Sequence, residues 1–109
     1  MDERDRALIL EFKGKLPLDL ESHLKRFIVF GSRVRGKATE DSDLDLIVLV
    51  DKKSSEIEKQ LEDIAYQVMW DHDFKPMLSL KIVEESQYHQ SLDKGFSFYR
   101  HVEKEGIPV

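Results

Sequence analysis

Two aspartates separated by one residue are the groups of this sequence best suited to chemistry. Asp43 and Asp45 stand at the start of an apolar stretch that ends at Val50. In an extended strand both side chains point to one face, with Cα atoms about 6–7 Å apart. Two partly desolvated carboxylates at that spacing repel each other, and a divalent cation such as Mg²⁺ removes the repulsion by binding to both. The alternative interpretation is an exposed acidic turn that enters a strand.

A Gly-Ser pair precedes the two aspartates by ten residues. Gly31-Ser32 directly follows the short apolar run at 27–30. Glycine allows unusual backbone angles, so the main chain can approach a ligand closely, and the amides and hydroxyl of Ser32 suit phosphate oxygens. We expect residues 33–36 to form one helical turn whose free amides add to this anion site. The alternative is an ordinary turn that ends a strand.

Two arginines follow the Gly-Ser pair. Arg33 and Arg35 lie within the sequence RVRG, and a guanidinium group is well suited to phosphate oxygens. Each is therefore a candidate for contact with a phosphate or a partner, and a plain surface position is the alternative for each.

The apolar periodicity indicates which elements must position these groups. It predicts helices at 3–15, 20–25, 55–70, 84–92 and 96–105, and strands at 27–30, 44–50 and 77–83. A capping box at 55–58 begins the third helix, Gly106 ends the last one, and residues 37–42 are expected to be a loop. In the strand at 44–50, one face carries Leu44, Leu46, Val48 and Val50, and the other carries Asp45, Ile47 and Leu49 after Asp43. The expected fold class is α+β, a short mixed sheet flanked by helices.

Composition limits the class of protein. The 109 residues are 40% apolar and 36% charged, with a net charge of −5 and no cysteine. These values indicate one globular domain over 1–109, without disulfides or thiolate metal sites. The acidic balance argues against a general nucleic-acid binder. With no apolar run of membrane-spanning length and no signal-peptide core, a cytoplasmic location is expected.

The stretch GSRVRGKATEDSDLDLIVLV resembles the signature of minimal nucleotidyltransferase domains of the polymerase-beta superfamily. That signature is a Gly-Ser turn after a strand, about ten residues, and then Asp-hydrophobic-Asp at the start of the next strand. The order of helices and strands and the ending FYRHVEKEGIPV extend the resemblance over nearly the whole chain.

The resemblance implies a reaction and roles for these residues. Asp43 and Asp45 would be catalytic and hold Mg²⁺, in a site with room for two metals. Gly31, Ser32, Arg33, Arg35 and Ser42 would bind the nucleotide. ATP or another nucleoside triphosphate would give a nucleoside monophosphate, AMP in the case of ATP, to an acceptor hydroxyl, and pyrophosphate would leave.

The sequence departs from the family at the third strand. Active members of the superfamily usually carry a third carboxylate there, but the less apolar face of residues 77–83 shows Ser79 and Lys81. Asp73 would replace it only if the strand began earlier, although Pro76 intervenes. The candidates for the third-carboxylate region are therefore Asp73 and Ser79.

Stand-alone domains of this family often act as antitoxins that add AMP to a tyrosine of a helical HEPN toxin. The resemblance therefore implies a HEPN-family protein as partner and acceptor, and it leaves self-association open. The alternative is a non-catalytic module that binds a nucleotide or a partner and neutralises or scaffolds that partner by contact. The missing carboxylate favours this alternative, and the intact Gly-Ser and Asp-Leu-Asp motifs oppose it.

Overall fold

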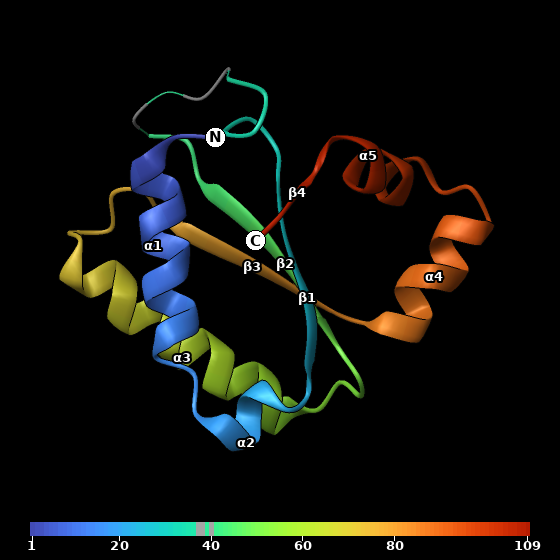
Figure 1. Ribbon diagram of the computed structural model, residues 1–109, viewed down its shortest axis with the longest axis horizontal. Helices are drawn as coiled ribbons and strands as arrows, with labels where there is room; N and C mark the ends of the chain where they lie inside the picture. Colours follow the sequence, from blue (N-terminus) through green and yellow to red (C-terminus); the bar gives the residue numbers. More distant parts are fainter. Residues whose placement is uncertain (37–38, 40) are drawn as a thin grey trace.

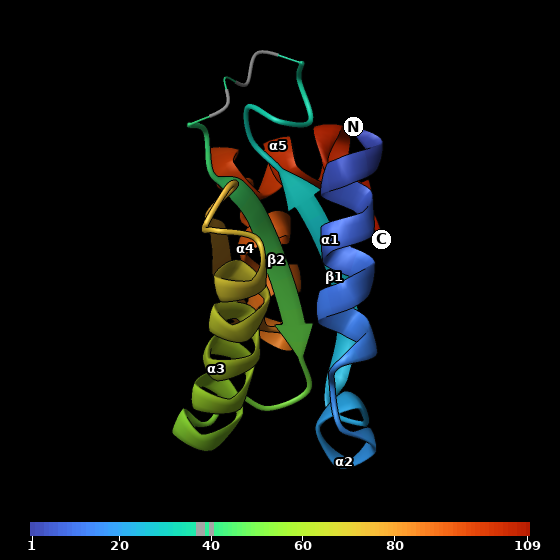
Figure 2. The same ribbon diagram turned by 90° about the vertical axis from the view of Figure 1, so that its left-hand side faces the viewer.

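A four-stranded sheet lies between two layers of helices (Figure 1, Figure 2). The structure, a computed structural model, describes residues 1–36, 39 and 41–109. Its elements, in chain order, are α1 (Glu3–Gly14), α2 (Leu18–Glu21), β1 (Leu24–Phe30), β2 (Leu44–Val50), α3 (Ser55–Asp71), β3 (Leu78–Glu84), α4 (Glu85–Asp93), α5 (Ser97–Glu105) and β4 (Ile107–Pro108).

The sheet is mixed, with strand order β3-β2-β1-β4. β1 is antiparallel to both β2 and β4, whereas β2 and β3 are parallel and are joined through α3. The predicted fold class, a short mixed sheet flanked by helices, is confirmed.

The two faces of β2 belong to two different cores. The face of Leu44, Leu46, Val48 and Val50 packs in one cluster with residues of α1 and α3, including Ile9, Phe12 and Leu61. The face of Ile47 and Leu49 packs in a second cluster with Tyr88 of α4 and Val102 of α5. Figure 2 shows α1 and α3 on one side of the sheet and α4 and α5 on the other. The predicted division of this strand is confirmed, and the face that Asp45 begins is the one covered by α4 and α5.

Two elements near the ends of the chain differ from the predictions. The predicted helix at 20–25 is wrong in its second half, because α2 ends at Glu21 and β1 already begins at Leu24. Leu24 pairs with Val50 at the end of β2, and a bulge lies between Leu24 and Arg26. The short strand β4 was not predicted. Its two residues pair with Val29 and Ile28, which is a tertiary contact rather than a local pattern.

Other boundaries moved by one residue. α3 takes Ser54 as its N-cap, whose hydroxyl accepts from the amide of Ile57 at 3.1 Å, so the cap precedes the predicted box at 55–58. β3 begins at Leu78 instead of residue 77, and Gly106 follows α5 as its C-cap, as predicted. The predicted loop at 37–42 includes residues 37, 38 and 40, which lie outside the described residues. In the described part of the chain, no helix has both the length and the apolar character to span a membrane.

Candidate active site

Gly31 and Asp45 are in close contact where β1 ends and β2 begins. Asp45 pairs with Phe30 across the antiparallel ladder, so the residue after Phe30 lies beside the carboxylate. Gly31 has φ +89°, and a Cβ atom placed on it would lie 2.6 Å from Asp45 Oδ2. A position with this backbone angle and this clearance accepts glycine and strains other residues. The main chain at Gly31 therefore lies against a carboxylate of the candidate metal pair, and its predicted approach to a phosphate stays a prediction.

The turn that follows Gly31 presents unused hydrogen-bonding groups. The amides of Val34 and Arg35 donate to the carbonyl of Gly31 at 3.1 and 3.4 Å, which closes a turn over 31–36 without a regular helix. Within the described residues, neither the amide nor the hydroxyl of Ser32 has a hydrogen-bond partner. These are the groups that the sequence predicts for phosphate.

The two aspartates form an electrostatically unfavourable pair. Asp43 is exposed and Asp45 is half-buried. Burial raises the pKa of the Asp45 carboxyl, and the negative charge of Asp43 raises it further. A divalent cation would relieve both effects, because it supplies positive charge and takes carboxylate oxygens as ligands. The two carboxylates fit Mg²⁺ as donors, and Asp43 and Asp45 would be its protein ligands.

The third strand places a hydroxyl beside this pair. Ser79 is the register partner of Asp45 in the parallel ladder, and it is exposed. Asp73 would lie on the strand only if the strand began earlier, but β3 begins at Leu78 and Asp73 lies in the connection after α3, with φ +55°. Asp73 therefore does not lie on β3. The strand residue next to Asp45 is Ser79. Among the described residues, no group of three or more His, Cys, Asp or Glu side chains is placed to hold a metal.

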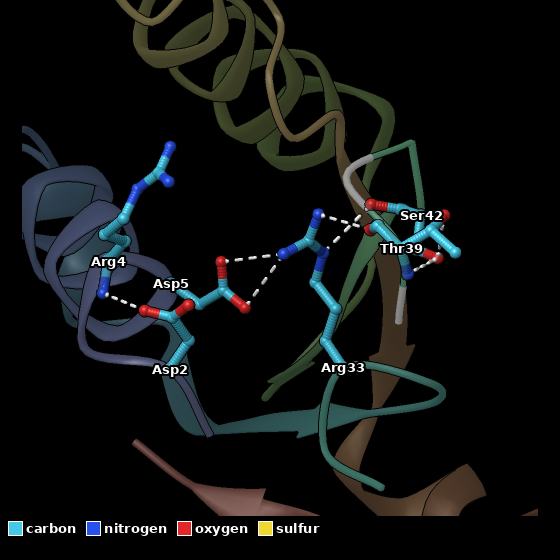
Figure 3. Close-up of polar contacts among 6 residues, drawn as sticks. All are labelled: Asp2, Arg4, Asp5, Arg33, Thr39 and Ser42. Atoms are coloured by element: carbon cyan, nitrogen blue, oxygen red, sulfur yellow. Dashed lines mark hydrogen bonds and ion pairs between the residues drawn. The ribbon is translucent and has the colours of Figure 1, made fainter. Parts of the chain in front are cut away.

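Arg33 is already engaged with protein groups. Its Nη1 donates to both carboxylate oxygens of Asp5, at 3.1 and 3.2 Å, and its Nε donates to the carbonyl of Ser42 at 2.9 Å. Nη2 donates to the carbonyl of Thr39 at 3.3 Å. Figure 3 shows the guanidinium between α1 and the segment that precedes β2. The predicted phosphate contact of Arg33 gains no support from these contacts.

Arg35 and Ser42 occupy different surroundings. Arg35 is exposed and lines a cavity of about 290 Å³ with Gly31, and Phe98, His101 and Glu105 line its α5 side. The hydroxyl of Ser42 accepts from the amide of Thr39 at 3.0 Å. Arg35 therefore shares a cavity with Gly31, while Ser42 uses its hydroxyl to shape the chain before Asp43.

A larger cavity, of about 550 Å³, is lined by Arg33. Residues of the first turn of α1, the turn after β1 and Pro76 line it, and Asp43 and Asp45 are not among them. We place the candidate site at the aspartates instead, because the chemistry depends on the carboxylate pair and the Gly-Ser turn.

Asp5 is the functional candidate that the sequence analysis missed. It is almost fully buried although it carries a charge. The sequence does indicate that Asp5 is buried. It lies three, four and seven residues before Leu8, Ile9 and Phe12, and therefore on the apolar face of α1. A carboxylate on the buried stripe of a helix requires a partner, and that partner is Arg33.

Comparisons with known proteins identify the family of this chain. The pattern of the family described as "Nucleotidyltransferase domain" matches residues 9–101. A protein of Methanocaldococcus jannaschii, named "Putative protein adenylyltransferase MJ0141", is 35% identical over 82 residues, which cover 72% of this chain and 83% of that protein.

Two solved structures match most of the length of this chain. One, the "Crystal structure of the toxin-antitoxin with AMP-PNP", superposes with a TM-score of 0.53 and 17% identity, over 95% of this chain and 70% of that chain. The other is a "putative nucleotidyltransferase from Sulfolobus solfataricus", with a TM-score of 0.47 and 14% identity, over 94% of this chain and 72% of that chain.

The fold is that of a small α+β protein with a mixed sheet. The chain belongs to the nucleotidyltransferase domain family, whose pattern covers most of its length. Its class of activity is therefore nucleotidyl transfer.

Proposed function

We propose that this chain transfers AMP from ATP to a hydroxyl of a partner protein, with Mg²⁺ held by Asp43 and Asp45. The observation that carries the proposal is the contact between the Gly-Ser turn and the carboxylate pair. Gly31 lies against Asp45, and the amide and hydroxyl of Ser32 are unused within the described residues. When bound, Mg²⁺ supplies positive charge for the triphosphate and for the oxygens that enter and leave.

The residues of the chain bind and orient the substrates. Ser32 donates its amide and hydroxyl to the phosphates, and Arg35 reaches the nucleotide from the cavity that it shares with Gly31. The acceptor oxygen forms a bond to the α-phosphorus while the bond to the β-phosphate breaks, so AMP stays on the acceptor and pyrophosphate leaves. Ser79 is not a base at neutral pH, so the acceptor proton passes to water or to a group that the partner supplies.

The acceptor in this proposal is a tyrosine of a HEPN-family helical protein, and the chain acts as its antitoxin. The resemblance to minimal nucleotidyltransferases supports this role. The names of two similar proteins support it as well, since one is called a protein adenylyltransferase and the other is a toxin-antitoxin structure with a nucleotide analogue. The cytoplasm, where ATP is available, is the proposed location.

A labelling experiment tests the transfer. The protein is incubated with Mg²⁺, ATP and the product of an adjacent HEPN-type gene, with ³²P in the α-phosphate in one reaction and in the γ-phosphate in another. We expect label on the partner from the α-position only. Asp43→Asn and Asp45→Asn should each lower it by about 100-fold or more, because each removes a metal ligand.

The matched control is Asp41→Asn, which removes an exposed carboxylate two residues before Asp43. This variant should keep its activity if only the strand aspartates hold the metal. Tight partner binding without label in the wild type would instead support the non-catalytic module, which Ser79 at the third-carboxylate position favours.

A further inference from the structure

One side chain connects three separate parts of the chain at the candidate site. Arg33 contacts Asp5 of α1 through Nη1 and the carbonyl of Ser42 through Nε. The ion pair is shielded from water, since the side chains of Arg33 and Asp5 are only 11% and 4% exposed. Figure 3 shows the guanidinium pointing from its own turn toward both groups.

The anchor of this contact is a helix fixed in the core. Asp5 lies in the first turn of α1, and the same helix buries Leu8, Ile9 and Phe12. A guanidinium is planar and rigid, so two bonds from Nη1 to one carboxylate also set the direction in which Nε points. Asp5 therefore determines where Arg33 holds the carbonyl of Ser42.

The two ends of this connection belong to the two halves of the site. Arg33 directly follows Ser32 of the phosphate turn, and Ser42 directly precedes Asp43. We infer that Asp5 and Arg33 form a positioning pair, which sets the place of Asp43 relative to the Gly-Ser turn. This inference rests on the proposed function and gives Arg33 a role distinct from direct phosphate contact.

Three variants separate positioning from packing. Asp5→Asn removes the charge that orients Arg33, and Arg33→Lys keeps a positive charge but has a single nitrogen that cannot serve both partners. The double variant Asp5→Leu with Arg33→Met replaces the buried pair by apolar side chains of similar shape, which often preserves stability. It removes the bond to Ser42 without leaving a buried charge unpaired.

The expected results follow from that design. In both single variants kcat should fall by about 10–100-fold, the cost of a small misplacement at a reacting centre. KM for the triphosphate should stay within about threefold, because phosphate contacts persist. The double variant should melt near the wild-type temperature and yet keep the low kcat. If the double variant recovers both stability and kcat, the pair only packs and the inference is wrong.

A matched control uses the same helix. Glu11 pairs with His72 at 3.2 Å, and both side chains are about 40% exposed, at 39% and 42%. Glu11→Gln removes a carboxylate of α1 whose contact with His72 lies away from the site, so kcat should not change. An equal loss in this variant would attribute the effect to α1 as a whole and overturn the inference.

Amide hydrogen exchange provides a readout that does not depend on turnover. In Asp5→Asn, exchange in the peptide over 41–45 should become faster by about tenfold or more, whereas the α3 peptides should keep their rates. If the wild type shows no transfer, the proposed function fails and this exchange result alone decides the positioning role. Wild-type transfer with unchanged exchange and kcat in Asp5→Asn refutes the positioning role and leaves the proposed function intact.

Discussion

At the scale of single residues, the contact between Gly31 and Asp45 joins the two motifs of the candidate site. The turn and the strand are separated by more than ten residues in sequence, yet the missing side chain of Gly31 leaves room for Oδ2 of Asp45. The backbone of the turn can therefore lie against a carboxylate that would hold a metal. A side chain at position 31 must displace either the turn or the carboxylate.

Gly31→Ala tests this contact. Gly36→Ala is its matched control, because Gly36 also has a positive φ, of +70°, but a Cβ there meets nothing within 4 Å. Backbone strain alone should lower the free energy of unfolding of Gly36→Ala by about 1–2 kcal/mol. Gly31→Ala should lose more, and its AMP transfer should fall by at least about tenfold, because Asp45 is displaced. Urea unfolding and the α-labelled ATP assay measure the two effects.

Equal losses of stability in the two glycine variants, with transfer preserved in both, would contradict this account. The contact with Asp45 would then have no consequence beyond the backbone angle.

At the scale of elements, the start of α3 depends on one hydroxyl. Ser54 and Ser55 are adjacent, but only Ser54 caps the helix in the structure. Ser54→Ala should lower the free energy of unfolding by about 1 kcal/mol, because it removes the bond to the amide of Ile57. Ser55→Ala should change it by less than about 0.5 kcal/mol. Thermal unfolding of both variants measures the difference, and the reverse order would assign the cap to Ser55.

The elements show which features a sequence of this kind can predict. The period of two in β2 predicted both of its faces, because each face is buried against a different core and only one register satisfies both. The start of β1 was missed, because Leu24 and Lys25 lie in a polar stretch whose strand character comes from pairing with β2. Local patterns predict the elements that bury their own residues, and they miss those that depend on a neighbour.

In the candidate site, too, local sequence patterns predict some residues and miss those that depend on a distant partner. Gly31, Ser32, Asp43 and Asp45 form a motif with fixed spacing, so their types and order along the chain are enough to group them. The pair of Asp5 and Arg33 spans 28 residues and joins a helix to a turn. No local period encodes that partnership, although the charge on the buried face of α1 indicated that some partner must exist.

At the scale of the whole molecule, the free energy of unfolding should depend on pH through the contact between His23 and Asp51. This contact lies at the end of β2 opposite the candidate site. Asp51 follows β2 and contacts Nδ1 of His23 at 3.0 Å. The hydrogen bond with His23 is the largest cause that holds the pKa of Asp51 below its usual value. The pKa of Asp51 is lower in the folded than in the unfolded protein, so its ionised carboxylate stabilises the fold. This stabilisation is fully present above the unfolded pKa of about 3.9. It is lost as the pH falls through the folded pKa.

Asp51→Asn therefore has a pH-dependent effect. The variant should be less stable than the wild type at about pH 6, and the difference should shrink toward about pH 2, as the wild-type carboxyl takes up a proton. Urea unfolding of both proteins at the two pH values measures this. A difference that stays constant or grows on acidification would contradict the assigned contact.

The outer surface of α3 has a consequence for experiments on this protein. Trp70 is the only tryptophan of the 109 residues, it is 65% exposed, and it lies beside the rings of Tyr66 and Phe74. It belongs to the helical layer on the side of the sheet opposite Asp45. The chain thus carries its single tryptophan outside the candidate site. Its emission can follow the docking of a macromolecule on α3 in the same cuvette in which nucleotide turnover is assayed.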